Sequence, residues 1–434
     1  MTRNIAGVAV AAAMLAAGTA VAQDQAALTA KDEGSKTIRV DCSKGQSINA
    51  ALADKSDVLI VEFSGECYET VVIPRGSVTL RGVSDDAAIV GPGLGAPTPG
   101  LFGVSVVGCS NVALESFGTS GWLSGIDVKD GASVALLQIA ATANSRGLRV
   151  DTGASVTITD STFESVDRGI QAWSSSTVKF NGTVRANGGA IGVLVSNGSS
   201  LIAGASCLLE VNNHSGAGLQ LQQGSSALLV GSGTAVRIVA SGNPTAIVTL
   251  DSTLAASMVE LTGNTYGVRA LDSSHVTFYG GQISQNLQAG IAVGRGSSAL
   301  ASTARNPLVV EDNHFGVVVD SSAFAYLDSV ELADNLETGL LADGAGLEVW
   351  RVQATGNGTD AVLTFGARAD FGGGNILGTV SCDDTVLVRG DVGCTAAAAA
   401  ASPSARGLLR GVTRRGVARP LDRASPRSVD VLLP

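Results

Sequence analysis

The chain has 434 residues, of which 45 % are hydrophobic, 15 % are charged and only 4 % are aromatic, and it contains 55 glycines. This aliphatic content excludes an unstructured chain, because there is ample apolar surface to bury. Few aromatic residues beside many Gly, Ser, Val and Ala argue against an ordinary globular core and favour a molecule built from thin, similar layers.

The first 22 residues have the features of a secretory signal peptide. Arg3 supplies a positive start, residues 5–17 form an uncharged apolar stretch too short to span a bilayer, and Ala20-Val21-Ala22 is a small-x-small cleavage site. A linker is expected at 23–37. No later apolar run has spanning length, so the sequence predicts a secreted or periplasmic protein without a transmembrane segment.

The chain changes character after Cys394. Residues 395–434 contain an alanine run at 396–401 and seven arginines against two aspartates, a net +5. Residues 23–394 hold 20 basic and 36 acidic residues, a net −16. The Ala/Arg-rich segment is expected to be a disordered, solvated tail that could fold back on the acidic body. The alternative is an arm that seeks an anionic surface or polymer.

A repeat of about 23 residues runs through the middle of the chain. In each copy a Gly or Ala is followed by alternating aliphatic residues, and successive copies are 21 to 28 residues apart. We call these small residues anchors; they are Gly103, Gly125, Gly147, Gly169, Gly192, Gly218, Ala246, Gly267, Gly290, Gly316, Gly339 and Ala361.

The pattern inside each repeat indicates three short strands. Residues one and three positions after an anchor, such as Ile126 and Val128, are aliphatic, and a period of two places them on one face, the interior. A polar turn and a second β-like run follow. A third run ends in an asparagine, which tolerates left-handed backbone and could stack on its equivalents in a ladder. These asparagines are Asn144, Asn187, Asn213, Asn243, Asn264, Asn286, Asn313, Asn335 and Asn357.

Three strands per repeat without a helical segment exclude a βαβ fold. The sequence therefore predicts an all-β chain, a single-stranded right-handed parallel β-helix over residues 38–394 with about twelve to fourteen turns. The open end of such a solenoid needs a cap. A short amphipathic helix is expected at 47–53, with Ser47 as its N-cap and Ile48 and Leu52 facing inward.

The N-terminal segment resembles the opening of the pectin-lyase-like superfamily. The matching elements are the cap helix, the strand Val58-Leu59-Ile60-Val61, the turn Gly65-Glu66-Cys67-Tyr68-Glu69 and the strand Val78-Thr79-Leu80-Arg81-Gly82. Gly65 and Tyr68 are separated by two residues, where the superfamily commonly has one. The resemblance implies the fold and no particular activity, since this superfamily includes lyases, hydrolases, esterases, epimerases, adhesins and phage fibres.

Six cysteines in an exported chain permit disulfides. Cys42 and Cys67 flank the expected cap, and Cys382 and Cys394 flank the last turn, so two local disulfides are expected at the ends of the solenoid. Cys109 and Cys207 lie about four turns apart, roughly 19 Å at the strand spacing, whereas bonded cysteines have Cα atoms within about 7 Å. These two are expected to be buried free thiols.

The three histidines do not predict a metal site. His214, His275 and His314 fall on different turns, whereas metal ligands and a Ser/His/Asp triad must converge within a few Å. The sequence therefore predicts no metal, no cofactor and no nucleic-acid partner.

The outward positions of three consecutive repeats carry charged, amide and aromatic side chains that could bind a ligand. These positions are two and four residues after the anchor. They hold Asp127 and Lys129 in the first repeat, Arg149 and Asp151 in the second, and Gln171 and Trp173 in the third. Asp167 and Arg168 lie at the corner just before the third anchor. An aromatic ring, carboxylates and basic side chains on one exposed face suit an acidic glycan. The competing interpretation is charge compensation between neighbouring turns, which stabilises a sheet by a few tenths of a kcal/mol.

Three functions remain open on this sequence. The favoured one is an exported β-helix that binds polysaccharide or another cell-surface polymer without catalysis, because the motifs G-H-G and R-I-K of polygalacturonase-like enzymes are absent. The first alternative is a polysaccharide lyase or hydrolase that uses Asp127, Lys129, Arg149, Asp151 and Trp173, with an Arg or Lys as base. The second is a surface adhesin or structural fibre, for which residues 389–391, an R-G-D tripeptide, and the basic tail are weak support.

Overall fold

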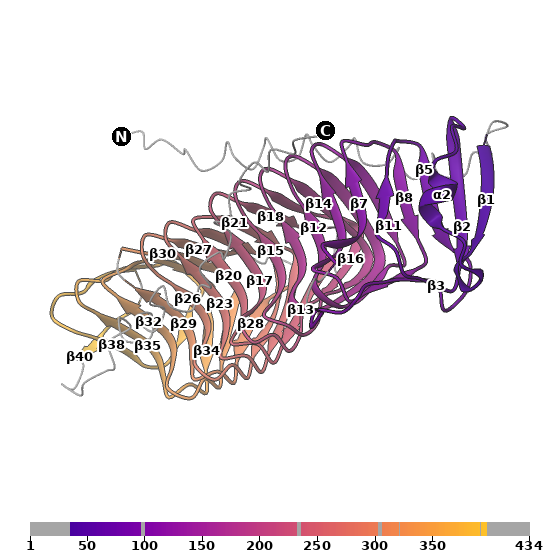
Figure 1. The fold of residues 1–434 in the computed structure, drawn as a ribbon. Coiled ribbons are helices and arrows are strands. Elements are labelled where there is room, and N and C mark those ends of the chain that lie inside the picture. The colour runs from indigo at the N-terminus through magenta and orange to yellow at the C-terminus, as the bar shows by residue number, and fades with distance from the viewer. Residues whose placement is uncertain are drawn as a thin grey trace, which may run out of the picture.

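The computed structural model describes residues 35–96, 100–231, 236–302, 306–320, 322–390 and 392–396. These residues form one elongated solenoid that winds turn upon turn from the indigo end to the yellow end (Figure 1). The strands pair in parallel, each with the equivalent strand of the next turn. The expected fold, an all-β right-handed parallel β-helix with a short N-terminal helix, is confirmed. The expected signal peptide and the part of the tail beyond 396 lie outside the described residues.

Three parallel sheets run along the solenoid, and four long strands bend around corners to join more than one of them. Sheet A consists of β1 (Ser35–Asp41), β2 (Val58–Ser64), β5 (Val78–Gly82), β8 (Val112–Glu115), β11 (Ser133–Leu137), β13 (Ser155–Ala172), β14 (Thr177–Arg185), β16 (Ser200–Glu210), β18 (Ser226–Leu229), β21 (Thr253–Ala256), β24 (His275–Phe278), β27 (Ser298–Ser302), β30 (Phe324–Asp328), β33 (Gly346–Trp350), β36 (Arg368–Phe371) and β39 (Leu387–Gly390).

Sheet B holds the anchors and precedes sheet A along the chain in each repeat. It consists of β4 (Val71–Ile73), β7 (Phe102–Val107), β10 (Ser124–Lys129), β12 (Ala140–Val150), the end of β13, β15 (Ile191–Val195), β17 (Ala217–Gln222), β20 (Thr245–Leu250), β23 (Tyr266–Leu271), β26 (Ala289–Val293), β29 (Phe315–Asp320), β32 (Thr338–Asp343), β35 (Thr359–Thr364), β38 (Val380–Cys382) and β40 (Thr395–Ala396).

Sheet C closes the turn. It consists of β3 (Glu66–Cys67), β6 (Ala88–Val90), β9 (Gly118–Ser120), parts of β12, β13, β14 and β16, then β19 (Val236–Ser241), β22 (Met258–Thr262), β25 (Gly281–Ser284), β28 (Leu308–Glu311), β31 (Val330–Ala333), β34 (Gln353–Thr355) and β37 (Ile376–Leu377).

The solenoid has more turns than the anchors indicate. The described part of sheet A contains sixteen strands, so there are about sixteen turns rather than twelve to fourteen. The additional turns lie at the ends, because β1, β2 and β5 precede the first anchor, Gly103, and β39 follows the last. The first strand also starts at Ser35, three residues before the expected boundary, so end turns form without the glycine signal.

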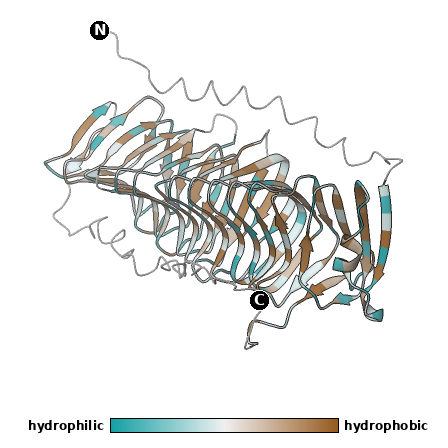
Figure 2. Ribbon diagram, turned by 45° about the horizontal axis from the view of Figure 1, so that its top comes forward, coloured by the Kyte–Doolittle hydropathy of each residue, from teal (hydrophilic) through white to brown (hydrophobic). Residues whose placement is uncertain are grey.

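The interior is lined by the residues one and three positions after each anchor. Ile126 and Val128 are fully buried there, as predicted, and brown residues alternate with teal ones along the strands in Figure 2. The anchors are small because adjacent turns approach closely; a Cβ on Gly316 would lie 2.4 Å from the carbonyl oxygen of Gly339. The last anchor was misassigned: Ala361 pairs with Leu340 and is an interior residue, so Asp360 occupies the anchor position.

The expected N-terminal cap is confirmed. Helix α2 (Ile48–Leu52) begins after Ser47, whose Oγ accepts a hydrogen bond from Ala50 N at 3.3 Å, and a 3-10 helix, η2 (Cys42–Lys44), precedes it. Glu69 adds a second cap, because its carboxylate accepts hydrogen bonds from Ile48 N at 2.6 Å and from Ser47 Oγ at 2.8 Å. The glutamate of the superfamily-like turn therefore fastens the helix to the first turns.

A buried asparagine ladder forms one corner of the solenoid. In all but the last member, the side-chain Nδ2 donates to the Oδ1 of the asparagine on the next turn, at 2.9 to 3.2 Å; the members are Asn243, Asn264, Asn286, Asn313, Asn335 and Asn357. Backbone N–H groups join the same oxygens, as from Asn264 N to Asn286 Oδ1 at 3.1 Å. The predicted stacking is thus confirmed for these six residues, and their amides are hydrogen-bonded at a corner that is buried up to Asn335 and half-buried at Asn357.

Two details of the asparagine prediction are wrong. Asn144, Asn187 and Asn213 lie outside the ladder. His214 takes the position one turn before Asn243, whose Oδ1 accepts from His214 N at 2.9 Å. The left-handed backbone belongs to the residue that precedes the ladder asparagine, as at Gln285 and Asp312 with φ of 57° and 54°. The asparagine side chain bonds along the column instead of supporting its own backbone turn.

Both predicted disulfides are present. Cys42 is bonded to Cys67 beside the cap, and Cys382 is bonded to Cys394 at the last turns. Cys109 and Cys207 are buried free thiols, as predicted, and burial raises the pKa of Cys207 to about 12. None of the helices in the described part of the chain is long and apolar enough to cross a membrane.

Candidate functional site

The five predicted site residues meet on the outer face of sheet B: Asp127 and Lys129 lie on β10 and Arg149 on β12, while Asp151 and Trp173 directly follow the ends of β12 and β13. Asp127 pairs in register with Arg149, and Arg149 pairs with Gln171 on the following turn. The backbone N–H of Trp173 donates to Val150, the neighbour of Asp151, at 2.8 Å. Equal offsets therefore stack, and we call the set Asp127, Lys129, Arg149, Asp151 and Trp173 the charged strip.

Arg149 is the centre of the ion pairs in the charged strip. Its Nη2 lies 2.6 Å from Asp151 Oδ2, and its Nε lies 3.8 Å from Asp127 Oδ1. Lys129 Nζ lies 3.6 Å from the other oxygen of Asp127. One guanidinium thus joins two carboxylates that come from adjacent turns, and a lysine completes the network.

The strip is less solvent-facing than the offset rule predicts. Asp127 and Asp151 are buried, with 4 % and 9 % of their surface exposed, whereas Lys129, Arg149 and Trp173 are half-buried. The reason is side-chain length, since the longer basic side chains extend beyond the short carboxylates they bind. A ligand would therefore meet the lysine, the arginine and the indole first.

The pKa values of the two carboxyl groups of the strip are shifted in opposite directions. Burial raises the pKa of Asp127, and the nearby positive charges of Arg149 and Lys129 oppose this only in part. Burial also acts to raise the pKa of Asp151, but hydrogen bonds from Arg149 and Ser174 outweigh it, so the pKa of Asp151 is lowered. The more buried carboxyl is thus the easier one to protonate.

A further arginine belongs to this surface and was missed in the sequence. Arg146 pairs in register with Arg168, one residue before the anchors Gly147 and Gly169. Arg168, noted at the corner, donates from Nη1 to Gln171 Oε1 at 3.1 Å and lies 3.6 Å from Asp167. The signal was an arginine directly before the anchor in two successive repeats. The position before the anchor also faces outward, which the two-and-four offset rule ignored.

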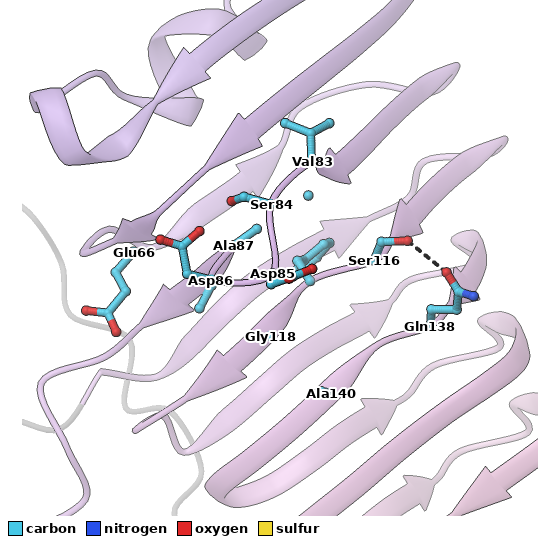
Figure 3. Close-up of a pocket in the computed structure, with 13 residues that line it drawn as sticks. Glu66, Val83, Ser84, Asp85, Asp86, Ala87, Ser116, Gly118, Gln138 and Ala140 are labelled. Atoms are coloured by element: carbon cyan, nitrogen blue, oxygen red, sulfur yellow. Dashed lines mark hydrogen bonds between the residues drawn. The ribbon is translucent and has the colours of Figure 1, made fainter.

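A hollow near the N-terminal end has different chemistry. It has a volume of about 620 Å³ and is lined by thirteen residues, among them the carboxylates of Glu66, Asp85 and Asp86 and no basic side chain (Figure 3). On its rim Ser116 Oγ donates to Gln138 Oε1 at 3.0 Å. Its acidic lining would repel an acidic polymer, so the hollow does not extend the charged strip.

The histidines lie apart, as expected. His214 is buried with its Nε2 2.7 Å from Ala186 O, His275 bonds Ser298, and His314 lies 3.1 Å from Glu337. Among the described residues, no group of three His, Cys, Asp or Glu side chains is placed to hold a metal ion. Of the R-G-D tripeptide, Arg389 and Gly390 end β39, and position 391 lies outside the described ranges.

Comparison with known proteins yields similarity of structure at low identity. No protein-family model matches the chain, and no curated protein matches it. The mannuronan C-5 epimerase AlgE6 A-module of Azotobacter vinelandii is 15 % identical, with a TM-score of 0.41, over 80 % of this chain and 94 % of that one. The ORF18 protein of Geobacillus virus E2 is 11 % identical, with a TM-score of 0.28, over 81 % of this chain and 59 % of that one.

Proposed function

We propose that this protein is exported and binds an acidic polysaccharide or cell-surface polymer at the charged strip without transforming it. The observation that carries the proposal is the network around Arg149, which presents a guanidinium, an ammonium and the Trp173 indole on three consecutive turns of one sheet. Arg146 and Arg168 add positive charge at its edge.

The chemistry of the strip suits an extended anionic chain. A guanidinium can bind carboxylate or sulfate oxygens with two parallel hydrogen bonds, and an indole offers a flat apolar plate for a sugar ring. Turns repeat at about 4.8 Å, so equivalent side chains recur along a straight line. A linear polymer laid along the solenoid axis would meet these side chains one turn after another.

Export is supported by the ends of the chain. Two disulfides fasten the first and last described turns, and disulfides persist in oxidising compartments. Together with the signal-peptide features of residues 1–22, they support a location in the periplasm or outside the cell.

One observation favours catalysis as a second candidate function. Asp127 and Asp151 lie on either side of Arg149, and burial and ion pairing displace their pKa values in opposite directions. Such a pair is the arrangement from which a general acid and a general base are made. The missing enzyme motifs argue against it, so binding is the first candidate.

The test measures binding of polygalacturonate, with neutral dextran as the control polymer. Trp173→Ala is expected to weaken binding by about 1 kcal/mol, the value of one stacking contact. Trp350→Ala is the matched control, since Trp350 is a half-exposed tryptophan on sheet A. Arg149→Gln should weaken binding further and reduce its salt dependence, whereas Arg237→Gln, on sheet C, should not.

Two results would decide against the proposal. Equal affinity of wild type, Trp173→Ala and Arg149→Gln would leave the strip as charge compensation between turns. A rise in ultraviolet absorbance from unsaturated uronate products, lost in Asp127→Asn, would establish the lyase alternative instead.

A further inference from the structure

A second apolar cluster lies outside the solenoid, on sheet B. Val317 and Val319 belong to the interior, whereas Val318 between them points the opposite way and packs in a separate cluster. We call this cluster the outer apolar face; its members are Tyr266, Leu271, Ala289, Ala292, Phe315, Val318 and Leu341, with Leu250 and Val362 at its margins. It extends over strands β20 to β35.

The outer apolar face is shielded from water. Val318 and Leu341 expose 0 % and 1 % of their surface, although both lie on the outside of the sheet. The principal neighbours of β26, β29 and β32 are strands of the solenoid itself, which pack beside and behind them. A side chain that points away from a sheet is excluded from water only by something that lies on that face, so this face has a cover.

Arg269 indicates what the cover must offer. Its guanidinium lies 4.4 Å from the centre of the Tyr266 ring, within the outer apolar face, and only 9 % of the residue is exposed. Its Nε and Nη2 have no hydrogen-bond partner among the described residues. A buried guanidinium needs acceptors, so the cover must bring carbonyl or carboxylate oxygens as well as apolar side chains.

We propose that the C-terminal segment of this same chain, residues 397–434, covers the outer apolar face. The described chain ends in β40, which pairs with β38 of sheet B, so the segment leaves from the sheet it would cover. From β38 back to β20 is six turns, about 29 Å at the strand spacing. The 38 residues that follow Ala396 are more than long enough, since even a fully helical chain advances 1.5 Å per residue.

The composition of this segment matches the face. It offers an alanine run and the apolar residues Leu408, Leu409 and Val412, and peptide carbonyls for Arg269. Its seven arginines are opposite in sign to the side chains of Asp320 and Asp343, which end β29 and β32 beside this face. Apolar contact and opposite charge therefore favour the same occupant, and an acidic glycan would satisfy neither.

The test is thiol labelling of the full-length exported protein. Ala292→Cys places a thiol in the outer apolar face, and Leu336→Cys is the exposed reference, since 74 % of Leu336 is exposed. Maleimide should label Ala292→Cys at least about tenfold more slowly than the reference, as expected for a site that reacts only when its cover opens. The buried thiols of Cys109 and Cys207 serve as internal unreactive groups.

A tail variant identifies the cover. Replacing Leu408, Leu409 and Val412 by Ser, with the solenoid unchanged, should bring the labelling rate of Ala292→Cys to within about threefold of the reference, because the cover then opens readily. Trypsin should also cleave at the tail arginines faster in this variant than in the wild type. An unchanged circular dichroism spectrum and an unchanged rate for Leu336→Cys show that the solenoid is intact.

Three outcomes would overturn the proposal. Fast labelling of Ala292→Cys with the native tail would show an uncovered face. Protection that persists in the tail variant, with twice the monomer mass by light scattering, would assign the cover to a second copy of the chain. Protection that persists in a monomer would assign it to another segment.

Discussion

Two stretches of sheet B share the same interior and differ on their outer face. In both stretches aliphatic residues such as Ile126 and Ile291 fill the inside. On the outside, the column two residues after the anchor begins as Ser105, Asp127, Arg149 and Gln171, and later becomes Ala292, Val318, Leu341 and Val362. The inner columns and the corners therefore specify the fold, and the outer face is free to change from a polar, charged surface to an apolar one.

Magnitudes explain this division. Burying one large aliphatic side chain contributes about 1.5–3 kcal/mol, and the inner columns repeat this on every turn. A pair of charges across neighbouring strands contributes only about 0.2–1 kcal/mol. Outer residues can therefore be selected for what they contact, with little effect on whether the turn forms.

The largest expected effect tests whether the two interiors are equivalent. Ile126→Ala, in the charged stretch, and Ile291→Ala, in the apolar stretch, should each destabilise the protein by about 2–5 kcal/mol, because each leaves a cavity in a close-packed interior. Thermal unfolding followed by circular dichroism measures both. Val309→Ala is the control, since Val309 is half-buried on the outside of β28 and its loss should be small. If only one of the two substitutions lowered the stability, the interiors of the two stretches would not be equivalent.

The asparagine ladder adds a second difference between the stretches, because it runs from Asn243 to Asn357 only. Asn286→Ala removes the oxygen that binds Asn264 and the donor to Leu261 O, and it should cost about 1–3 kcal/mol for the buried groups left unpaired. Asn187→Ala, outside the ladder and half-buried, is the matched control in the same unfolding experiment. Equal losses of stability in the two variants would mean that the ladder asparagines stabilise the fold no more than an asparagine at another corner does.

Much of this fold was predictable because it repeats. Eleven of the twelve anchors were assigned correctly, so the one misassigned anchor, Ala361, did not affect the prediction of the repeat. The cysteine pairs were predictable because each pair lies at one end of the solenoid. The end turns were missed because they lack the glycine, and His214 was missed as a ladder residue because an imidazole can replace an amide that donates to a carbonyl. The stacking of Asp127 on Arg149 also followed from the repeat. The burial of Asp127 did not, because it depends on where long side chains lie.

The charged strip should show opposite effects at its two carboxylates. The folded pKa of Asp127 lies above its unfolded value, so the ionised group is unfavourable at neutral pH and stability is regained as the pH falls through the folded pKa. Asp127→Asn should therefore raise the melting temperature at pH 7 and make no difference at pH 3.

Asp151→Asn provides the opposite sign. The folded pKa of Asp151 is lowered, so its stabilisation is present above the unfolded pKa and is lost as the pH falls through the folded one. The substitution should lower the melting temperature at pH 7. Shifts of the same sign in both variants would show that the two carboxyls do not differ as described.

The smallest expected effect concerns the ladder position before Asn243. Burial lowers the pKa of His214, so the unfolded chain takes up the proton first and stability falls as the pH drops below about 6.5. His214→Asn would restore the residue type of the later turns and remove this contribution to the pH dependence. Melting temperatures at pH 7 and pH 5 measure it, with His275→Asn, whose pKa is also lowered by burial, as the comparison. An unchanged slope in His214→Asn would show that the site titrates normally.

The parallel register has a consequence for how such a chain can change in length. Because Gly267 and Gly290 are equivalent positions, removal of residues 267–289 would join Tyr266 to Gly290 and take out one turn, with each remaining strand still facing an equivalent neighbour. Both boundaries of that unit carry the same small residue, so unequal recombination between repeats in the coding sequence would give chains shortened or lengthened by whole turns. Homologous chains of different lengths would then differ in steps of one repeat, with the two disulfide-bonded ends conserved.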